Sequence, residues 1–309
     1  MFRLSLTNRT GLKASKASIP FFRSHHSVAW LHASQLECSD EQSHIESIHK
    51  HLETTGVLKI DLGFEDSDSR YMQQVILNLH KFHGHGLPIT HSASRGWFWD
   101  VRPLARAQPT ITKPARSETA QDFPWHTDCS YEHYPPRFFA LQVLQPDRCG
   151  GGTLSILNVD RLIQLLPMAT RISLSKADYR ITVPAEFIKS DERYITGSIL
   201  GQALDSGSSE LRFREEILTP LSSSARLAIE ELGKTLHSRQ AREATVDLTP
   251  ELLPRGSIIL INNRKWLHAR SEVKDPQRHL RRVRWDARPF VAGDTLPFEH
   301  VDNLVNSHL

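Results

Sequence analysis

The residues best suited to chemistry in this sequence are His126 and Asp128, which stand two positions apart between Phe123 and Tyr131. In an extended segment, residues i and i+2 face the same side, so an imidazole and a carboxylate can reach one point. Such a pair is half of a metal site. Non-haem Fe(II) is held by two histidines and one carboxylate on one face, which leaves its other positions open. We therefore expect a second, remote histidine.

The same His-x-Asp/Glu triplet also begins at His44, His51 and His300. The first two lie in a segment with helical apolar spacing, where residues two apart do not face each other. The third lies in a polar tail. Only His126 and Asp128 precede a long β-type run, residues 138–144, that can hold them on a scaffold.

His268 is the best candidate for the third ligand, because it follows the buried-type run 257–261 and an Asn-Asn turn. That position places it at the start of the next strand, near the mouth of a sheet. A lone histidine in such a place more often belongs to a core. The ligand interpretation therefore depends on the residues that follow it.

Three arginines follow His268 on one face of a predicted strand: Arg278, Arg282 and Arg284, with Arg281 on the other face. Guanidinium groups inside a barrel are costly unless anionic groups meet them. One arginine can hold a carboxylate through two parallel hydrogen bonds, as a dicarboxylic acid would require. The alternatives are a solvated basic edge or a patch that contacts nucleic-acid phosphates.

Taken in order, these motifs resemble those of the Fe(II)/2-oxoglutarate-dependent dioxygenases of the taurine dioxygenase superfamily. The motifs are most similar to those of its clavaminate synthase-like and γ-butyrobetaine hydroxylase-like branches. The resemblance is carried by His126-Thr127-Asp128, Gly151-Gly152-Thr153, Asn263-Arg264, Leu267-His268-Ala269-Arg270 and Arg278-x-x-x-Arg282. One departure is Asn262, where many relatives have Asp. The resemblance covers roughly residues 37–290. Because no Pro/Gly/Ser-rich linker divides the middle of the chain, we expect a single dioxygenase domain over residues 37–309.

The resemblance also implies roles for individual residues. His126, Asp128 and His268 would bind Fe(II), and Arg278 and Thr153 would hold the cosubstrate 2-oxoglutarate, with O2 as the second cosubstrate. No further catalytic residue is implied.

The predicted substrate wall consists of aromatic and basic residues, because a small-molecule pocket combines an apolar lining with a few charges. Its members are Arg282, Arg284, Tyr131, Trp97 and Trp99. Arg282 matches the position where relatives hold an anionic group of the substrate. Each tryptophan is at least equally compatible with a place in the core.

The implied reaction converts 2-oxoglutarate to succinate and CO2 while a small molecule is hydroxylated. We expect a carboxylate-bearing, amino acid- or betaine-like substrate, or a secondary metabolite. One rival is a Zn2+ hydrolase that uses the same two histidines and Asp128 with metal-bound water. The other is a non-enzymatic basic protein that binds nucleic acid. The sequence does not indicate the oligomeric state.

The surrounding elements must position these residues, and their pattern predicts a mainly β fold. Helices are predicted over 40–55, 71–82 and 225–236, and strands over 57–60, 96–101, 138–144, 153–157, 179–183, 210–213 and 257–261. A loop or lid is predicted over 102–117. Many short strands with few helices favour a double-stranded β-helix (jelly roll) core with flanking α-helices.

The first 36 residues differ in composition from the rest of the chain, because they are basic and Ser-rich and contain no acidic residue before Glu37. This pattern resembles a mitochondrial transit peptide, and a disordered basic tail on a cytoplasmic protein is the alternative. No apolar run is long enough to span a membrane. The net charge of +3 is too small to imply a nucleic-acid partner. We therefore expect a small-molecule substrate, with neither a membrane nor nucleic acid as partner.

Overall fold

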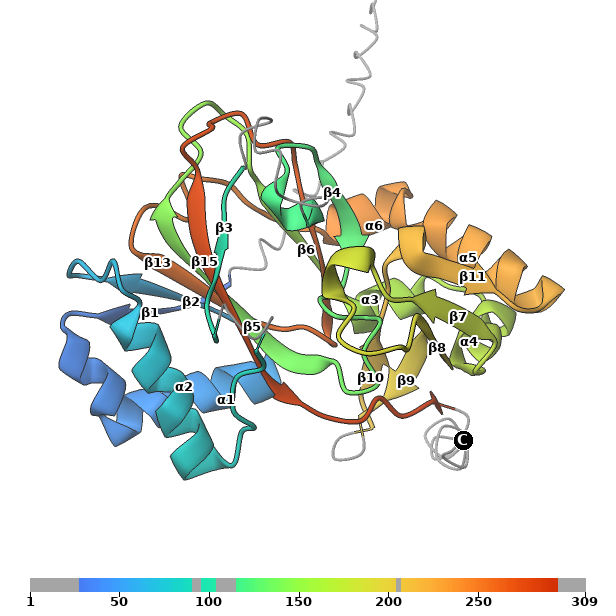
Figure 1. Cartoon of the computed structure of the whole chain (residues 1–309), viewed down its shortest axis with the longest axis horizontal. Coiled ribbons are helices and arrows are strands. Elements are labelled where there is room, and N and C mark those ends of the chain that lie inside the picture. The colour runs from blue at the N-terminus through green and yellow to red at the C-terminus, as the bar shows by residue number, and fades with distance from the viewer. Residues whose placement is uncertain (1–27, 91–95, 104–114, 204–206, 294–309) are drawn as a thin grey trace, which may run out of the picture.

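Two sheets face each other across an apolar interior (Figure 1). The predicted metal ligands lie on strands of the smaller sheet or in the turn that follows one of them. The computed structural model describes residues 28–90, 96–103, 115–203 and 207–293. Within these ranges the protein is mainly sheet, with several antiparallel sheets and some helices, as predicted.

The larger sheet has six strands in the order β1-β2-β13-β5-β15-β3. Their bounds are β1 (Ala29–Ala33), β2 (Val57–Leu62), β13 (Ser257–Asn262), β5 (Pro136–Gln145), β15 (His279–Ala287) and β3 (Trp99–Val101). All neighbours are antiparallel except β1 and β2. The continuous apolar run of β13 follows from burial on both faces. Ile259 and Ile261 face the interior between the sheets, whereas Ile258 and Leu260 face the helices outside.

The smaller sheet has four strands in the order β12-β6-β14-β4. Their bounds are β12 (Val246–Leu248), β6 (Leu154–Asn158), β14 (Trp266–Arg270) and β4 (Phe123–His126). Leu154 and Ile156 of β6 share one buried cluster with Phe139 of β5 and Leu280 of β15. The two sheets therefore pack face to face.

Helices α1 (Gln42–Thr54) and α2 (Arg70–His83) cover the outer face of the larger sheet, as Figure 1 shows. Ile45, Ile48 and Leu52 of α1 are fully buried at helical spacing. Gly84 ends α2 with a positive φ of 67°, a conformation that glycine adopts without steric cost. The predicted helices 40–55 and 71–82 are thus confirmed.

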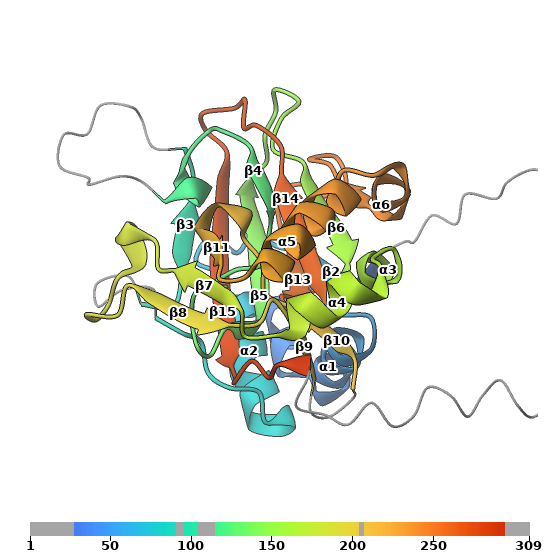
Figure 2. The same cartoon turned by 90° about the vertical axis from the view of Figure 1, so that its right-hand side faces the viewer.

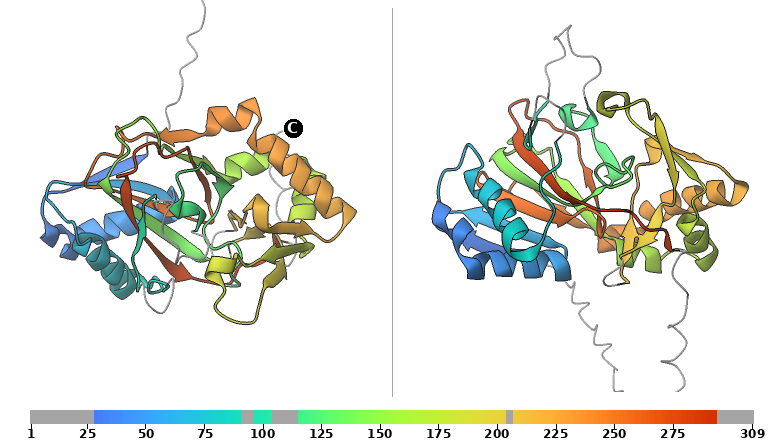
Figure 3. Two further views of the ribbon diagram at one scale, coloured as in Figure 1. Left: turned by 45° about the horizontal axis from the view of Figure 1, so that its top comes forward. Right: turned by 60° about the horizontal axis from the view of Figure 1, so that its bottom comes forward.

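A long insertion between β6 and β12 forms a second layer beside the smaller sheet (Figures 2 and 3). It contains α3 (Val159–Gln164), α4 (Met168–Ser175), α5 (Ser223–Leu236) and α6 (Arg239–Ala244), with the sheets β11 (Leu218–Pro220)-β7 (Tyr179–Thr182)-β8 (Tyr194–Gly197) and β9 (Leu200–Gln202)-β10 (Ser209–Leu211). Short 3-10 turns include η3 (Ala185–Phe187) and η4 (Glu215–Ile217). The predicted helix 225–236 is confirmed as α5, which the Ser222 hydroxyl caps by accepting from Ala225 N–H.

Strand β1 corrects the leader boundary predicted at residue 36. Ala29–Ala33 pair in parallel with β2 as an edge strand of the larger sheet, so this part of the predicted leader belongs to the fold. Residues 1–27 lie outside the described residues, as do 104–114 of the predicted loop and the triplet at His300. None of the helices in the described ranges has both the length and the apolar character needed to cross a bilayer.

Candidate active site

The turn after β4 carries Asp128, whereas His126 is the last residue of that strand. The pair does not lie in one continuous strand, because Cys129 adopts a positive φ of 55° and the chain turns there. Asn263 fixes the turn: its Oδ1 accepts from Asp128 N–H at 2.7 Å, and its Nδ2 donates to the Asp128 carbonyl at 2.9 Å. Asn263 also donates to the Pro136 carbonyl, which ties the turn to β5.

His268 on β14 lies directly opposite His126 on β4 in the antiparallel pair. The ring centroids are 4.1 Å apart, and each Nε2 lies 3.8 Å from Asp128 Oδ1. The three ligand atoms lie within 4.8 Å of one another, and all three side chains are buried. The structure thus brings the predicted remote histidine to the other two groups.

The hydrogen bonds around His126 suit a metal ligand. Its Nδ1 lies 2.8 Å from the Pro124 carbonyl, which can only accept, so Nδ1 carries the proton and Nε2 keeps its lone pair toward Asp128. Burial, together with His268, lowers the pKa of His126 well below its usual value and keeps the ring neutral. Two imidazole nitrogens and one carboxylate are the donor set of a non-haem Fe(II) centre.

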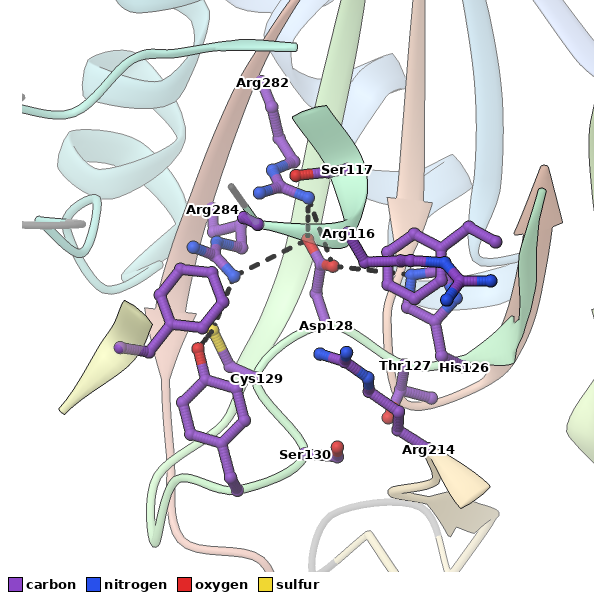
Figure 4. Close-up of a pocket in the computed structure, with 14 residues that line it drawn as sticks. Arg116, Ser117, His126, Thr127, Asp128, Cys129, Ser130, Arg214, Arg282 and Arg284 are labelled. Carbon is purple, nitrogen blue, oxygen red and sulfur yellow. Dashed lines mark hydrogen bonds and ion pairs between the residues drawn. The ribbon is translucent and has the colours of Figure 1, made fainter. Parts of the chain in front are cut away.

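Arg282 and Arg284 of β15 both reach the Asp128 carboxylate, as Figure 4 shows. Arg282 Nη1 lies 3.3 Å from both carboxylate oxygens, and Arg284 Nη1 lies 3.8 Å from Oδ2 and donates to Cys129 Sγ at 2.6 Å. Burial opposes ionisation of Asp128, but the two arginines outweigh it and hold its pKa well below the usual range. Arg281 points to the other face and binds Asp100 at 2.8 Å, as the strand pattern predicted.

Arg278 lies further along the interior, where it lines a second cavity with apolar residues such as Leu154 and Leu280. It is buried, and its Nη1 has no hydrogen-bond partner among the described residues. Burial is the main reason that its pKa falls to about 9. Gly152 makes room for it, because a Cβ at that glycine would lie 2.9 Å from Arg278 Nε.

Thr153 is half-buried just before β6 and is held by its backbone. Its N–H donates to Ser271 Oγ, and its carbonyl accepts from Ser271 N–H, both at 3.0 Å. At Gly151 a Cβ would come within 2.4 Å of the Glu272 carbonyl. The Gly-Gly-Thr motif therefore lets the chain run close to the segment that leads to Arg278.

The predicted substrate residues divide into two groups. Tyr131 lines the cavity that contains Asp128, and its ring stacks on Phe187 at 5.5 Å. Trp99 is buried 5.9 Å from the same Phe187 ring. Trp97 instead packs against the cluster beneath α1 and α2, which matches the core interpretation.

Several lining residues were not singled out from the sequence, above all Arg214, Ser130 and Phe187. Arg214 reaches the site because Thr127 bonds Phe213 twice: the Thr127 N–H donates to the Phe213 carbonyl at 2.8 Å, and the Phe213 N–H donates to Thr127 Oγ1 at 3.0 Å. No local pattern indicates a pairing between segments so far apart in the chain.

Of the known proteins compared with this chain, only solved structures are similar to it. No protein-family model matches the sequence, and no curated protein matches it. Among solved structures, asparagine oxygenase in complex with Fe(II), 3-hydroxyasparagine and succinate is 19% identical, with a TM-score of 0.61 over 83% of each chain. A second asparagine oxygenase structure is 17% identical, with a TM-score of 0.61 over 86% of this chain and 99% of the other.

The non-heme iron oxygenase OrfP, in complex with Fe and α-ketoglutaric acid, is 15% identical, with a TM-score of 0.59 over 81% of this chain and 83% of the other. The chain has the fold of these oxygenases. That fold agrees with the one implied by the sequence motifs.

Proposed function

We propose that the protein is an Fe(II)/2-oxoglutarate-dependent oxygenase that hydroxylates a small carboxylate-bearing, amino acid-like molecule. The observation that carries the proposal is the convergence of His126, Asp128 and His268, buried beside inward-facing arginines. The similar structures support it by what they contain: asparagine oxygenase holds Fe(II) with hydroxyasparagine and succinate, and OrfP holds Fe with succinate and dihydroxy-L-Arg. In this proposal the two facing sheets are a double-stranded β-helix (jelly roll) core.

His126, Asp128 and His268 would hold the metal, and hydrogen bonds define the positions of two of them before it binds. Asn263 holds the backbone of Asp128, and the Pro124 carbonyl fixes the tautomer of His126. Bound Fe(II) would supply the oxidative chemistry, in which O2 and 2-oxoglutarate become succinate, CO2 and a hydroxyl group on the substrate. The residues of the chain bind, orient and desolvate the reactants.

Arg278 would bind the distal carboxylate of 2-oxoglutarate. Its burial and its unpartnered Nη1 support this role, since a buried guanidinium without an anion is costly. The apolar lining of its cavity suits the methylene groups of the cosubstrate. Thr153 would hydrogen-bond the same cosubstrate, as the motif implies.

The walls of the cavity around Asp128 would exclude water. The stacked rings of Tyr131 and Phe187 line it, and Trp99 packs 5.9 Å from the Phe187 ring. Arg282 and Arg284 offer guanidinium groups to an anionic part of the substrate once a metal ion shares the Asp128 charge. This supports a carboxylate-bearing substrate over a neutral one.

The test is anaerobic addition of Fe(II) and 2-oxoglutarate, followed by O2 and measurement of succinate. We expect a visible charge-transfer absorption band before O2 and succinate after it. Asp128→Ala should lose both, whereas Asp191→Ala, at an exposed position, should retain both. Full succinate formation by Asp128→Ala would contradict the proposal. A Zn2+ hydrolase would give no such band.

A further inference from the structure

We propose, on the basis of the function above, that the substrate carries two anionic groups, and that Arg214 and Ser130 bind the one that Arg282 and Arg284 do not. The substrate class would then be a small diacid, such as an acidic amino acid. Arg214 and Ser130 would determine specificity at the outer part of the cavity.

The first step concerns the charge of the cavity that contains Asp128. Four arginines line it, and Asp128 is its single carboxylate among the described residues. Its arginines are Arg116, Arg214, Arg282 and Arg284. Both β15 arginines, each almost fully buried, already share Asp128. A divalent ion on Asp128 adds positive charge, so the cavity favours an anion beyond the cosubstrate.

The second step concerns groups that have no partner. Ser130 is 1% exposed and lines the cavity, yet its hydroxyl has no hydrogen-bond partner among the described residues. The same is true of Arg214 Nε, although Arg214 Nη2 donates to Glu216 at 3.1 Å. Buried polar groups are normally hydrogen-bonded, so these two atoms indicate a ligand that accepts from both. A carboxylate oxygen is such an acceptor.

The third step concerns position. In Figure 4, Arg214 and Ser130 lie below Asp128, whereas Arg282 lies above it. Arg214 also pairs with His126 in an isolated antiparallel β-bridge, which holds it beside the proposed metal ligands. The cavity therefore offers guanidinium groups on both sides of Asp128 in this view, which is the arrangement that two anionic groups of one substrate require.

The fourth step concerns competition from the protein's own carboxylates. Glu216 pairs with both Arg214 and Arg116, at 3.1 Å and 3.4 Å, but its side chain is 40% exposed. Arg214 is much less exposed, at 14%. An exposed carboxylate is largely solvated and contributes little as an ion pair, so a substrate can compete for Arg214. A guanidinium-bearing ligand, like the hydroxy-L-Arg bound in OrfP, would instead meet like charge.

The first experiment uses the unmodified full chain, anaerobic, with Fe(II) and saturating 2-oxoglutarate, so that a diacid cannot be bound by Arg278. Calorimetry measures the Kd of L-aspartate against that of L-asparagine, and the Kd of L-glutamate against that of L-glutamine. L-Arginine is measured as a cationic comparison. We expect each diacid to bind about 10-fold or more tightly than its amide, as one charge-assisted interaction allows. Equal or tighter binding of the amides or of L-arginine, or no binding of either diacid, would overturn the proposal.

The second experiment changes the outer subsite. Arg214→Gln should weaken diacid binding by about 10-fold and leave amide binding unchanged, and Arg214→Lys should restore part of the preference. Ser130→Ala should have a smaller effect of the same kind. Arg226→Gln, on the exposed face of α5, is the matched control. An unchanged diacid preference in Arg214→Gln would refute the assignment.

Failure of this proposal differs from failure of the proposed function. If the unmodified protein shows the charge-transfer band and binds 2-oxoglutarate but does not prefer diacids, only the substrate assignment is wrong. If it shows neither, the oxygenase function itself is wrong.

Discussion

Two groups of histidines and a carboxylate occur in the described part of the molecule, and they differ in what surrounds them. One is His126, Asp128 and His268, and the other is His49, Glu53 and His85. In each group the candidate ligand atoms lie within 4.8 Å of one another. By residue type and distance alone, both could hold a metal ion.

In the second group, hydrogen bonds already occupy the nitrogen and oxygen atoms that would bind a metal. Trp285 Nε1, which can only donate, points to His85 Nδ1 at 3.2 Å. A neutral His85 must therefore carry its proton on Nε2, where it faces His49 Nδ1 at 3.0 Å. Arg137 Nη2 lies 2.7 Å from both oxygens of Glu53. These contacts already use the atoms that a metal would need.

In the first group the hydrogen bond runs the other way: the Pro124 carbonyl accepts the proton of His126 Nδ1. The lone pair of His126 Nε2 therefore remains available for a metal ion. Its carboxylate contacts arginines at 3.3 Å and 3.8 Å, without the short two-oxygen contact that holds Glu53. The two groups therefore differ in the outer partners of their candidate ligands more than in residue type, and these partners favour a metal ion at His126, Asp128 and His268 only.

The largest expected difference is in metal binding. His268→Ala should weaken Fe(II) binding by more than the ~10–100-fold that loss of an outer partner typically costs, because it removes a ligand. His85→Ala should leave Fe(II) binding unchanged. Anaerobic equilibrium dialysis with metal analysis measures both. If His268→Ala still bound Fe(II) tightly, or if His85→Ala lost Fe(II) binding, the metal site would have to be assigned to the other group.

The second difference is in stability. Arg137 joins Glu53 to Asp286, which is 2% exposed and also pairs with Arg288 at 2.9 Å, so Arg137→Ala removes one of two cationic partners from a buried carboxylate. We expect a loss of about 2 kcal/mol in the free energy of unfolding, the effect of losing charge-assisted hydrogen bonds. Urea denaturation measures it, and Fe(II) affinity of the folded variant should remain unchanged. A loss below about 1 kcal/mol would mean that the network contributes little.

The third prediction refines the metal side of the comparison. Arg278→Ala should raise the KM for 2-oxoglutarate by about 10–100-fold, the effect of losing charge-assisted hydrogen bonds, while Fe(II) affinity stays near that of the unmodified protein. Steady-state succinate formation at varied 2-oxoglutarate measures it. If Arg282→Ala raised this KM and Arg278→Ala did not, the roles of the two arginines would have to be exchanged.

The smallest effect at neutral pH concerns His85. Burial is the main cause that lowers its pKa from 6.5 to about 3, so the unfolded chain binds its proton more readily than the folded protein. Stability should therefore fall as the pH drops below 6.5, by about 2 kcal/mol between pH 6.5 and 5. His85→Asn should flatten this slope in urea titrations at several pH values. An equally steep slope in that variant would exclude His85 as its source.

Local patterns predicted much of the site. Arg282 and Arg284 are neighbours in one strand, so strand alternation places them on the same face. His126 and Asp128 are also neighbours in the chain, but Asp128 reaches the site through a turn that Asn263 holds, which strand alternation does not describe. Arg214 was missed because the Thr127–Phe213 pairing that positions it joins distant segments.

The same reason explains the errors in the fold. Ala29–Ala33 were assigned to the leader because composition averages over a basic stretch, whereas their pairing with β2 is a tertiary contact. The helices α3 and α6 have six residues each, too few for a periodic pattern. The cluster around His85 depends on how α1 and α2 dock on β15, which no local rule describes.

The proposed metal ligands and part of the cavity lining come from different segments of the chain, which has a consequence for engineering. The proposed metal ligands lie on β14, at the end of β4 and in the turn after it, which Asn263 holds. Phe187 and Arg214 come from the insertion between β6 and β12. The two parts meet at Thr127 and at the buried ion pair of Arg264 with Glu210, among other contacts. Exchanging the insertion while preserving these contacts should redirect selectivity and leave the proposed metal site intact, so new catalysts could be obtained by grafting one contiguous segment.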